Sequence, residues 1–193
     1  SAASDVYKRQ HIGRARHLAR DEAARTKRAT ALKLPQLVYE PNALYRFTAE
    51  LVKKAEEEAA SELEKLDQRE REELESSLGV GAKGKGAAKA QRGASGRMKE
   101  LEKEQKNRRT RRTRDSLDLA LIDIAGLYRD AMLQAAGAMD GDGVPVGGHQ
   151  HPDMAATSKE LARRNSASAL MSCIDAVMEC REVLGYNVRP EVA

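Results

Sequence analysis

The chain of 193 residues contains no tryptophan and a single phenylalanine, and aromatic residues make up only 3% of it. A core without large aromatic side chains has to be built from Leu, Ala, Ile, Val and Met, which suits helix packing better than a sheet. Runs of β-branched residues are few, whereas the helix-favouring residues Ala, Glu, Arg and Leu are abundant. The composition therefore predicts an all-α protein.

Cysteine is scarce as well, since the chain has only Cys173 and Cys180. On one helix their spacing corresponds to a rise of about 10.5 Å, which is too far for a disulfide. We interpret both as small apolar side chains of a protein from a reducing cytoplasm. No apolar run reaches the roughly 18 residues of a membrane span, and no segment has the pattern of a secretory signal. We therefore expect a cytoplasmic protein with no membrane partner.

Residue patterns typical of catalysis are also missing. The Gly-rich segment GVGAKGKGAAK superficially resembles a phosphate-binding loop, but no strand is predicted before it and no Ser or Thr follows the lysine. His149 and His151 lie near Asp140 and Asp153 in a predicted loop, and without paired Cys ligands we favour loop polarity over a metal site. No Ser/His/Asp or Cys/His arrangement has a local signature. We predict a chain that is not an enzyme and that binds neither cofactor nor metal.

The strongest positive signal is the periodicity of an amphipathic helix between residues 108 and 133. Leu117, Leu121, Ile124 and Tyr128 follow one another at steps of four, three and four and therefore form one stripe. We expect this stripe to lie at the centre of the hydrophobic core. A second helix, from residue 158 to 184, carries the apolar residues Leu170, Ile174, Val177, Met178, Val183 and Leu184.

Capping residues, prolines and glycines predict the remaining boundaries. Residues 1–10 lack apolar periodicity, and we interpret them as a scar of cloning or sequence assembly. Helix is expected within residues 11–34, with Asp21 as an internal N-cap, and Pro41 opens the next helix. The Gly-rich residues 79–95 and 137–157 are predicted to be flexible linkers. The apolar stripe of the helix that follows Pro41 consists of Leu44, Phe47, Leu51 and Ala55.

Opposite charges are concentrated on the two sides of the first linker. From Glu56 to Glu75 ten acidic residues stand against three basic ones, and from Lys83 to Arg114 thirteen basic residues stand against three acidic ones. If the flanking helices fold back antiparallel, the acidic block faces the basic block, and Leu51 lies near Ile122. We therefore predict a long antiparallel helical hairpin. Its exposed ion pairs should contribute roughly 0.2–1 kcal/mol each and mainly fix its register.

The basic run from Lys103 to Arg114 also supports a second hypothesis. Its arginines could neutralise phosphates in a nonspecific nucleic-acid complex. The run has no aromatic side chains that would stack on bases and no recognition-helix pattern, so sequence-specific reading is not expected. We favour pairing with the Glu-rich helix and keep nucleic-acid binding as the alternative. The candidate contact residues are Arg108, Arg109, Arg111 and Arg112.

The segment GRMKELEKEQKNRRTRRTRDSLDLALIDIAGLYRDAML resembles the C-terminal part of the delta-prime subunits of bacterial DNA polymerase III, in their actinobacterial form. The family pattern RDxLDxALxDxxxLYRD is matched between Arg114 and Asp130. The triplet Gly13-Arg14-Ala15 resembles the end of an AAA+ lid. The family's closing pattern is matched by Ile174, Arg181, Leu184, Asn187 and Pro190.

The resemblance implies a non-catalytic clamp-loader subunit, an accessory part of a DNA-directed DNA polymerase, which is a nucleotidyltransferase complex. Residues 11–34 would be a remnant of the AAA+ lid, in which Arg14 occupies a sensor-like position with a structural role. Residues 41–193 would form the collar domain through which subunits oligomerise. Partners would be the tau/gamma and delta subunits, with the sliding clamp and primed DNA reached through the assembled complex. Expected core or interface residues are Leu117, Leu121, Ile124, Tyr128, Leu170, Ile174, Val177 and Leu184.

Overall fold

The computed structural model describes residues 18–78 and 87–186, and of residues 87–93 it describes the backbone alone. Helices dominate these residues, and no strand occurs among them beyond one isolated bridge between Met139 and Pro145. The predicted all-α class is therefore confirmed. Among the described helices, none has the length and apolar character needed to cross a membrane. The predictions for residues 1–10, Arg14, Asn187 and Pro190 lie outside the described residues.

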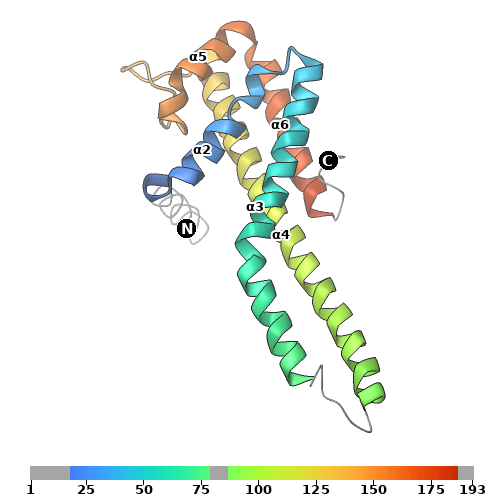
Figure 1. Ribbon diagram of the computed structural model, residues 1–193. Coiled ribbons are helices and arrows are strands. Elements are labelled where there is room, and N and C mark those ends of the chain that lie inside the picture. Colours follow the sequence, from blue (N-terminus) through green and yellow to red (C-terminus); the bar gives the residue numbers. More distant parts are fainter. Residues whose placement is uncertain (1–17, 79–86, 187–193) are drawn as a thin grey trace, which may run out of the picture. The chain divides into compact units, whose positions relative to one another are not determined.

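Two short 3-10 segments accompany the named helices in the part of the chain that the structure describes (Figure 1). The chain divides into two compact units, which we call the core unit (Ser1–Thr48 with Asp118–Ala193) and the hairpin unit (Ala49–Leu117). Helices α3 and α4 contribute to both units. The elements are α2 (Glu22–Ala31), η1 (Leu34–Gln36), α3 (Pro41–Ser77), α4 (Ala87–Ala135), η2 (Pro152–Met154), α5 (Ala155–Arg164) and α6 (Ala167–Gly185).

Two of the predicted helix starts are confirmed by their local contacts. Asp21 is the N-cap of α2, and its side chain accepts a hydrogen bond from the backbone N–H of Ala24 at 3.0 Å. This bond satisfies one of the N–H groups that have no partner within the helix. Pro41 is the first residue of α3, where its missing N–H costs nothing.

The core unit is held together by one cluster of apolar side chains. Ile124, Leu127, Tyr128 and Ala131 of α4 are buried in it, as the helical period predicts. Leu121 packs against this cluster but is only partly buried. Each fully buried side chain of this size contributes roughly 1.5–3 kcal/mol relative to an exposed one. The cluster is completed from other elements by Leu32, Leu161 and Leu170.

The predicted linker at residues 79–95 is too long, because α4 already begins at Ala87. Residues 79–86 lie outside the described residues. The segment that follows them contains Ala, Lys, Gln and Arg, which are strong helix formers. Gly93 and Gly96 are both accommodated within the helix, each at a cost of about 1 kcal/mol relative to Ala. Helix propensity therefore outweighs the glycines here.

The second predicted linker, residues 137–157, is also too long, and the helix after it is not continuous. Helix α5 begins at Ala155, and the predicted helix from residue 158 to 184 is broken between α5 and α6. Asn165 is extended and ends α5, and Ser166 begins α6 by accepting a hydrogen bond from the N–H of Ala169 at 3.1 Å. Asn and Ser favour such boundaries because their side chains compete for backbone groups.

Candidate interaction surfaces

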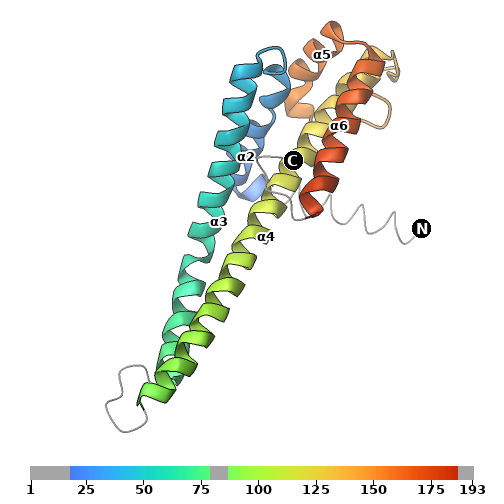
Figure 2. The same ribbon diagram turned by 90° about the vertical axis from the view of Figure 1, so that its right-hand side faces the viewer.

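Ion pairs connect α3 and α4 along the hairpin unit, where the two helices run side by side (Figure 2). Arg108 binds Glu70 through both terminal nitrogens, at 2.8 and 2.5 Å. Arg112 donates through Nε to Glu62 at 2.6 Å. The pairing of Glu62 with Arg112 differs by about one residue from the predicted register, in which Leu51 lies near Ile122. The predicted pairing of the acidic and basic blocks is therefore confirmed within this unit, and the proximity of Leu51 to Ile122 stays a prediction.

These pairs shift the pKa values of their members in the expected directions. The hydrogen bond from Arg108 lowers the pKa of Glu70 below its ordinary value, and a second bond from Gln105 adds to this shift. The bond to Glu62 raises the pKa of Arg112. Both members of the Arg112–Glu62 pair are about half exposed, so water and salt screen their attraction strongly.

Between the paired helices the hairpin unit buries polar side chains as well as the apolar side chains of Val52, Ala55 and Ala59. Asp67 is 1% exposed and Gln105 is 2% exposed. Arg109 donates through Nε to Asp67 at 2.8 Å, and the amide of Gln105 donates to the backbone oxygen of Asp67 at 2.9 Å. Arg71 in turn donates to the Gln105 side-chain oxygen at 3.2 Å. A shift in register would leave these buried groups without partners, so this network specifies the pairing.

The four arginines of the nucleic-acid hypothesis are not equivalent in the structure. Arg108, Arg109 and Arg112 form ion pairs with acidic residues of α3. Arg111 is exposed and contacts no acidic side chain within the described part of the chain. Three of the four candidates are thus engaged within the hairpin unit, as the pairing hypothesis predicts.

In the core unit, Asp130 of α4 holds the loop between α4 and α5 in place through hydrogen bonds. This carboxylate is fully buried and accepts hydrogen bonds from the backbone N–H groups of Gln150, at 2.9 and 3.1 Å, and His151, at 3.0 Å. The neighbouring Arg129 donates to the backbone oxygens of Gly148 at 2.8 Å and Val146 at 3.0 Å. The loop is therefore an ordered part of the core unit, not the flexible linker that its glycines predict.

His151 is a buried structural residue, and its hydrogen bonds fix its tautomer. Its Nε2 lies 2.9 Å from the backbone oxygen of Asp123, which can only accept, so Nε2 carries the proton. Its Nδ1 lies 2.7 Å from Nη2 of Arg28, which can only donate, so Nδ1 carries none. Burial and then the charge of Arg28 lower the pKa of His151 below 6.5, which keeps the ring neutral. His151 lies in the loop, as predicted, but it is buried and not a solvated polar residue.

Gly126 makes the position of His151 possible. A Cβ atom at this point of α4 would lie 2.6 Å from Nε2 of His151, closer than side-chain atoms approach one another. A glycine inside a helix costs about 1 kcal/mol relative to alanine. The absence of a side chain here lets the imidazole reach the carbonyl of Asp123. In the sequence, the only signal of this contact is a glycine within an otherwise regular helical stripe.

Arg28 connects α2 to the same loop. Its two terminal nitrogens donate to the Asp153 carboxylate at 2.6 and 2.8 Å, while one of them also reaches His151. The bond from Arg28 lowers the pKa of Asp153. Within the described ranges, no cluster of three or more His, Cys, Asp or Glu side chains is arranged to hold a metal.

Helix α6 directs one face to the core and exposes another. Leu170 and Leu184 are buried, and Ile174 and Val177 pack partly buried against the apolar cluster. Met178, which the period assigns to the buried stripe, is 47% exposed, so that assignment is wrong. Both cysteines are free, as expected from their spacing, and burial raises the pKa of Cys180.

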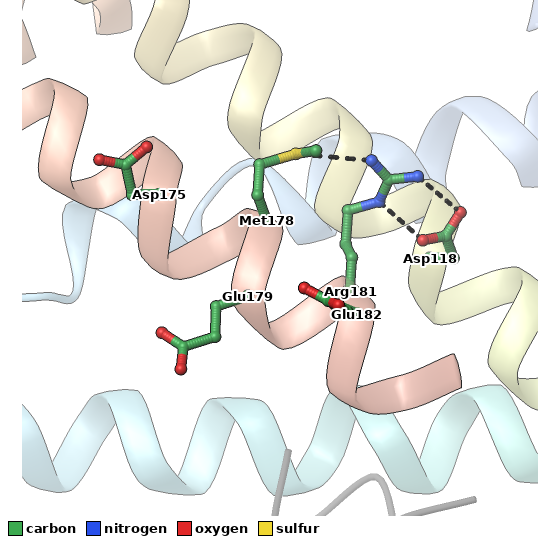
Figure 3. Close-up of a pocket in the computed structure, with 6 residues that line it drawn as sticks. All are labelled: Asp118, Asp175, Met178, Glu179, Arg181 and Glu182. Carbon is green, nitrogen blue, oxygen red and sulfur yellow. Dashed lines mark hydrogen bonds and ion pairs between the residues drawn. The ribbon is translucent and has the colours of Figure 1, made fainter. Parts of the chain in front are cut away.

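A shallow depression on the exposed side of α6 is lined by acidic residues around Met178 (Figure 3). Arg181 extends from α6 to Asp118 of α4 and binds its carboxylate through Nε at 2.7 Å and Nη2 at 3.2 Å. Its third nitrogen lies 3.5 Å from the sulfur of Met178. The other lining residues are Asp175, Glu179 and Glu182.

Comparison with known proteins gives no assignment, because no family model, curated protein or solved structure matches the chain. The structure offers two candidate interaction surfaces. One is the exposed cationic side of α4 around Arg111, and the other is the exposed side of α6 around Met178.

Proposed function

We propose that the chain is a non-catalytic part of a bacterial clamp loader, of the delta-prime type, that acts by binding other clamp-loader subunits. Its partners in this proposal are the tau/gamma and delta subunits in the cytoplasm. The assembled ring would load the sliding clamp on primed DNA. Residues 11–34 would derive from an AAA+ lid, and residues 41–193 would belong to the collar that joins the subunits.

One observation supports this proposal: several residues of the family resemblance take part in the packing of the core unit. Leu127 and Tyr128 lie in the apolar cluster, and Asp130 holds the loop before α5. Asp118 from the middle pattern binds Arg181 from the closing pattern. A pattern whose members are used for packing supports a role in assembly, since a catalytic pattern would place its polar members around a reacting group.

The proposal is tested by capture of purified clamp-loader subunits on the tagged full chain, followed by light scattering of the eluted complex. We expect a complex with tau/gamma or delta of defined stoichiometry. A matched variant, Ile124→Asp, introduces a charge into the apolar cluster and should lose capture together with its fold. If the folded wild-type chain captures none of the subunits, singly or mixed, the proposal is wrong.

Nonspecific nucleic-acid binding remains the second hypothesis, and Arg111 is the residue that tests it. We expect Arg111→Glu to leave the hairpin unit folded, because Arg111 makes no ion pair with α3 in the described residues. This hypothesis predicts that the DNA affinity of the wild type falls steeply as the salt concentration rises. A triple variant with Arg111→Glu, Lys103→Glu and Lys106→Glu should lose this salt-dependent binding. Unchanged weak binding in that variant would argue against it.

A further inference from the structure

The exposed side of α6 combines methionines with carboxylates in a regular order. Met171 and Met178 are 46% and 47% exposed. Met171, Asp175, Met178 and Glu182 follow one another at helical steps of four, three and four, so they form one stripe. Glu179 flanks it. We call these five residues the α6 outer face.

The α6 outer face is negatively charged although the chain as a whole has a net charge of +4. Arg181 is the cation that lines the depression, and its guanidinium is bound to Asp118. Asp175 and Glu179 make no ion pair within the described ranges. Glu182 accepts a hydrogen bond from the hydroxyl of Tyr186 at 3.1 Å, which leaves its charge in place. Three carboxylates therefore remain without a cation.

We propose that the α6 outer face is the docking site for a basic amphipathic helix of another clamp-loader subunit, an inference that rests on the proposed function. An amphipathic helix binds through apolar residues that recur every three to four positions. Met171 and Met178 are seven positions apart, so they lie two turns apart on one face of α6. Methionine adapts its shape to the apolar side of such a helix. The stems of lysine and arginine pack on apolar surface while their charged ends reach the flanking carboxylates.

The charge pattern favours a different subunit over a second copy of this chain. Exposed basic side chains occur on several helices of this chain, and those of α4 include Lys103, Lys106 and Arg111. If α4 of one copy bound α6 of the next, the contact would be head-to-tail and would form rings or open chains. A basic helix supplied by another subunit gives a closed pair without this consequence. Nucleic acid is disfavoured as the occupant, because its phosphates would meet three unpaired carboxylates.

The docking is tested with the full chain and a labelled model peptide, an amphipathic helix of about 18 residues made of leucine and lysine. Fluorescence anisotropy should show binding of this peptide and none of the matching leucine–glutamate peptide. The variant Asp175→Lys, Glu179→Lys, Glu182→Lys should bind the lysine peptide at least about ten-fold more weakly. The matched control Glu72→Lys, Glu73→Lys, Glu75→Lys reverses three exposed acids of the hairpin unit and should bind as the wild type does.

The methionines are tested separately from the charges. Met171→Ser with Met178→Ser should weaken peptide binding, and the corresponding leucine variants should restore it, because leucine keeps the apolar surface. If the lysine variant of α6 fails to fold, Asp175→Asn with Glu179→Gln removes charge without reversing it. Circular dichroism establishes that each variant is folded.

Three results would overturn the inference. If the α6 variant and the hairpin variant weaken binding of the lysine peptide equally, the peptide responds only to the net charge of the chain. Self-association of the wild type that disappears in the α6 variant would assign the face to a second copy. Capture of tau/gamma and delta that is the same for the wild type and the α6 variant would reject the docking site while the proposed function stands. If neither subunit is captured although the peptide binds, the proposed function and its partner assignment are rejected instead.

Discussion

At the scale of single residues, the core unit depends on polar side chains that are buried beside its apolar cluster. Asp123, Asp130 and His151 are 4%, 0% and 7% exposed, and Asp130 and His151 each form several of the contacts that connect α4 to the following loop. Removing one member leaves another buried group without its partner, which costs about 1–3 kcal/mol. Substitutions at these three positions should therefore destabilise the core unit more than the loss of a few side-chain atoms would by itself.

His151 should make the core unit sensitive to mild acid. The pKa of His151 is lowered in the folded chain, so below pH 6.5 the unfolded chain binds more protons and stability falls as the pH falls. The groups facing the ring are Arg28, Asp123, Asp130 and Asp153. Chemical denaturation between pH 7 and pH 5, an interval of about two units around the ordinary pKa, should show this loss.

The variant His151→Gln cannot titrate and should lose that dependence on pH, although it is less stable at pH 7. His149→Gln is the matched control and should keep it, because His149 does not form the contacts with Arg28 and Asp123. The loss of Asp153 ionisation occurs at lower pH, since the pKa of Asp153 is itself lowered. An equal pH dependence in the wild type and His151→Gln would contradict the assigned role.

Gly126→Ala should destabilise the core unit despite the better helix propensity of alanine. The added methyl group would lie 2.6 Å from Nε2 of His151, so the ring or the helix must move. Overpacking of this kind costs about 1–3 kcal/mol, against a propensity gain of about 1 kcal/mol. Gly96→Ala is the control, because its methyl group would meet nothing within 4 Å. The midpoint temperature of thermal unfolding should be lower for Gly126→Ala and slightly higher for Gly96→Ala than for the wild type.

At the scale of elements, the hairpin unit buries a charged network beside apolar side chains such as Ala55 and Ala59. Its paired helices enclose Asp67 and Gln105, and exposed ion pairs flank them. Exposed pairs contribute little each, whereas a buried charge that loses its partner costs about 3–5 kcal/mol. The register of α3 against α4 should therefore depend mainly on the buried network.

A double-mutant cycle on Asp67 and Arg109 tests this dependence. Asp67→Asn and Arg109→Gln should each destabilise the unit, and the double variant should be less destabilised than their sum, with a coupling of about 1–3 kcal/mol. The same cycle on Glu62 and Arg112, which are about half exposed, should give less than about 1 kcal/mol. Urea denaturation followed by circular dichroism measures both cycles. Equal coupling in the two cycles would show that burial does not decide the register.

Sequence reasoning succeeded at elements whose determinants are local and failed where they are not. Asp21 and Pro41 start helices through contacts within one turn, and the stripe around Ile124 follows from the helical period. The start of α4 at Ala87 was missed because glycines were weighted above the helix formers around them. The role of His151 could not be predicted, since it depends on Gly126 and Arg28, which are distant in sequence.

At the scale of the whole molecule, the two compact units bury different combinations of side chains. The core unit is based on an apolar cluster with buried hydrogen bonds. The hairpin unit combines buried apolar side chains with a buried polar network and exposed ion pairs. Salt screens exposed charges and affects buried apolar contacts far less. The units should therefore respond differently to ionic strength.

Raising the sodium chloride concentration should increase local opening in the hairpin unit and leave the core unit nearly unchanged. Hydrogen–deuterium exchange measured at about 0.01 M and 1 M salt, where the screening length falls from about 30 to 3 Å, separates the two responses. Peptides from residues 56–75 and 98–115 should exchange faster at high salt, and peptides from residues 120–133 should not. A uniform change in all peptides would contradict the division.

The tautomer of His151 also provides an internal spectroscopic probe. The proton on its Nε2 is held by the carbonyl oxygen of Asp123 and is shielded from water, so it should exchange slowly enough to be seen by NMR. Imidazole protons at exposed histidines exchange too fast to be observed. One resolved ring resonance would therefore follow the release of the loop from α4 in real time. It would do so without any label attached to the chain.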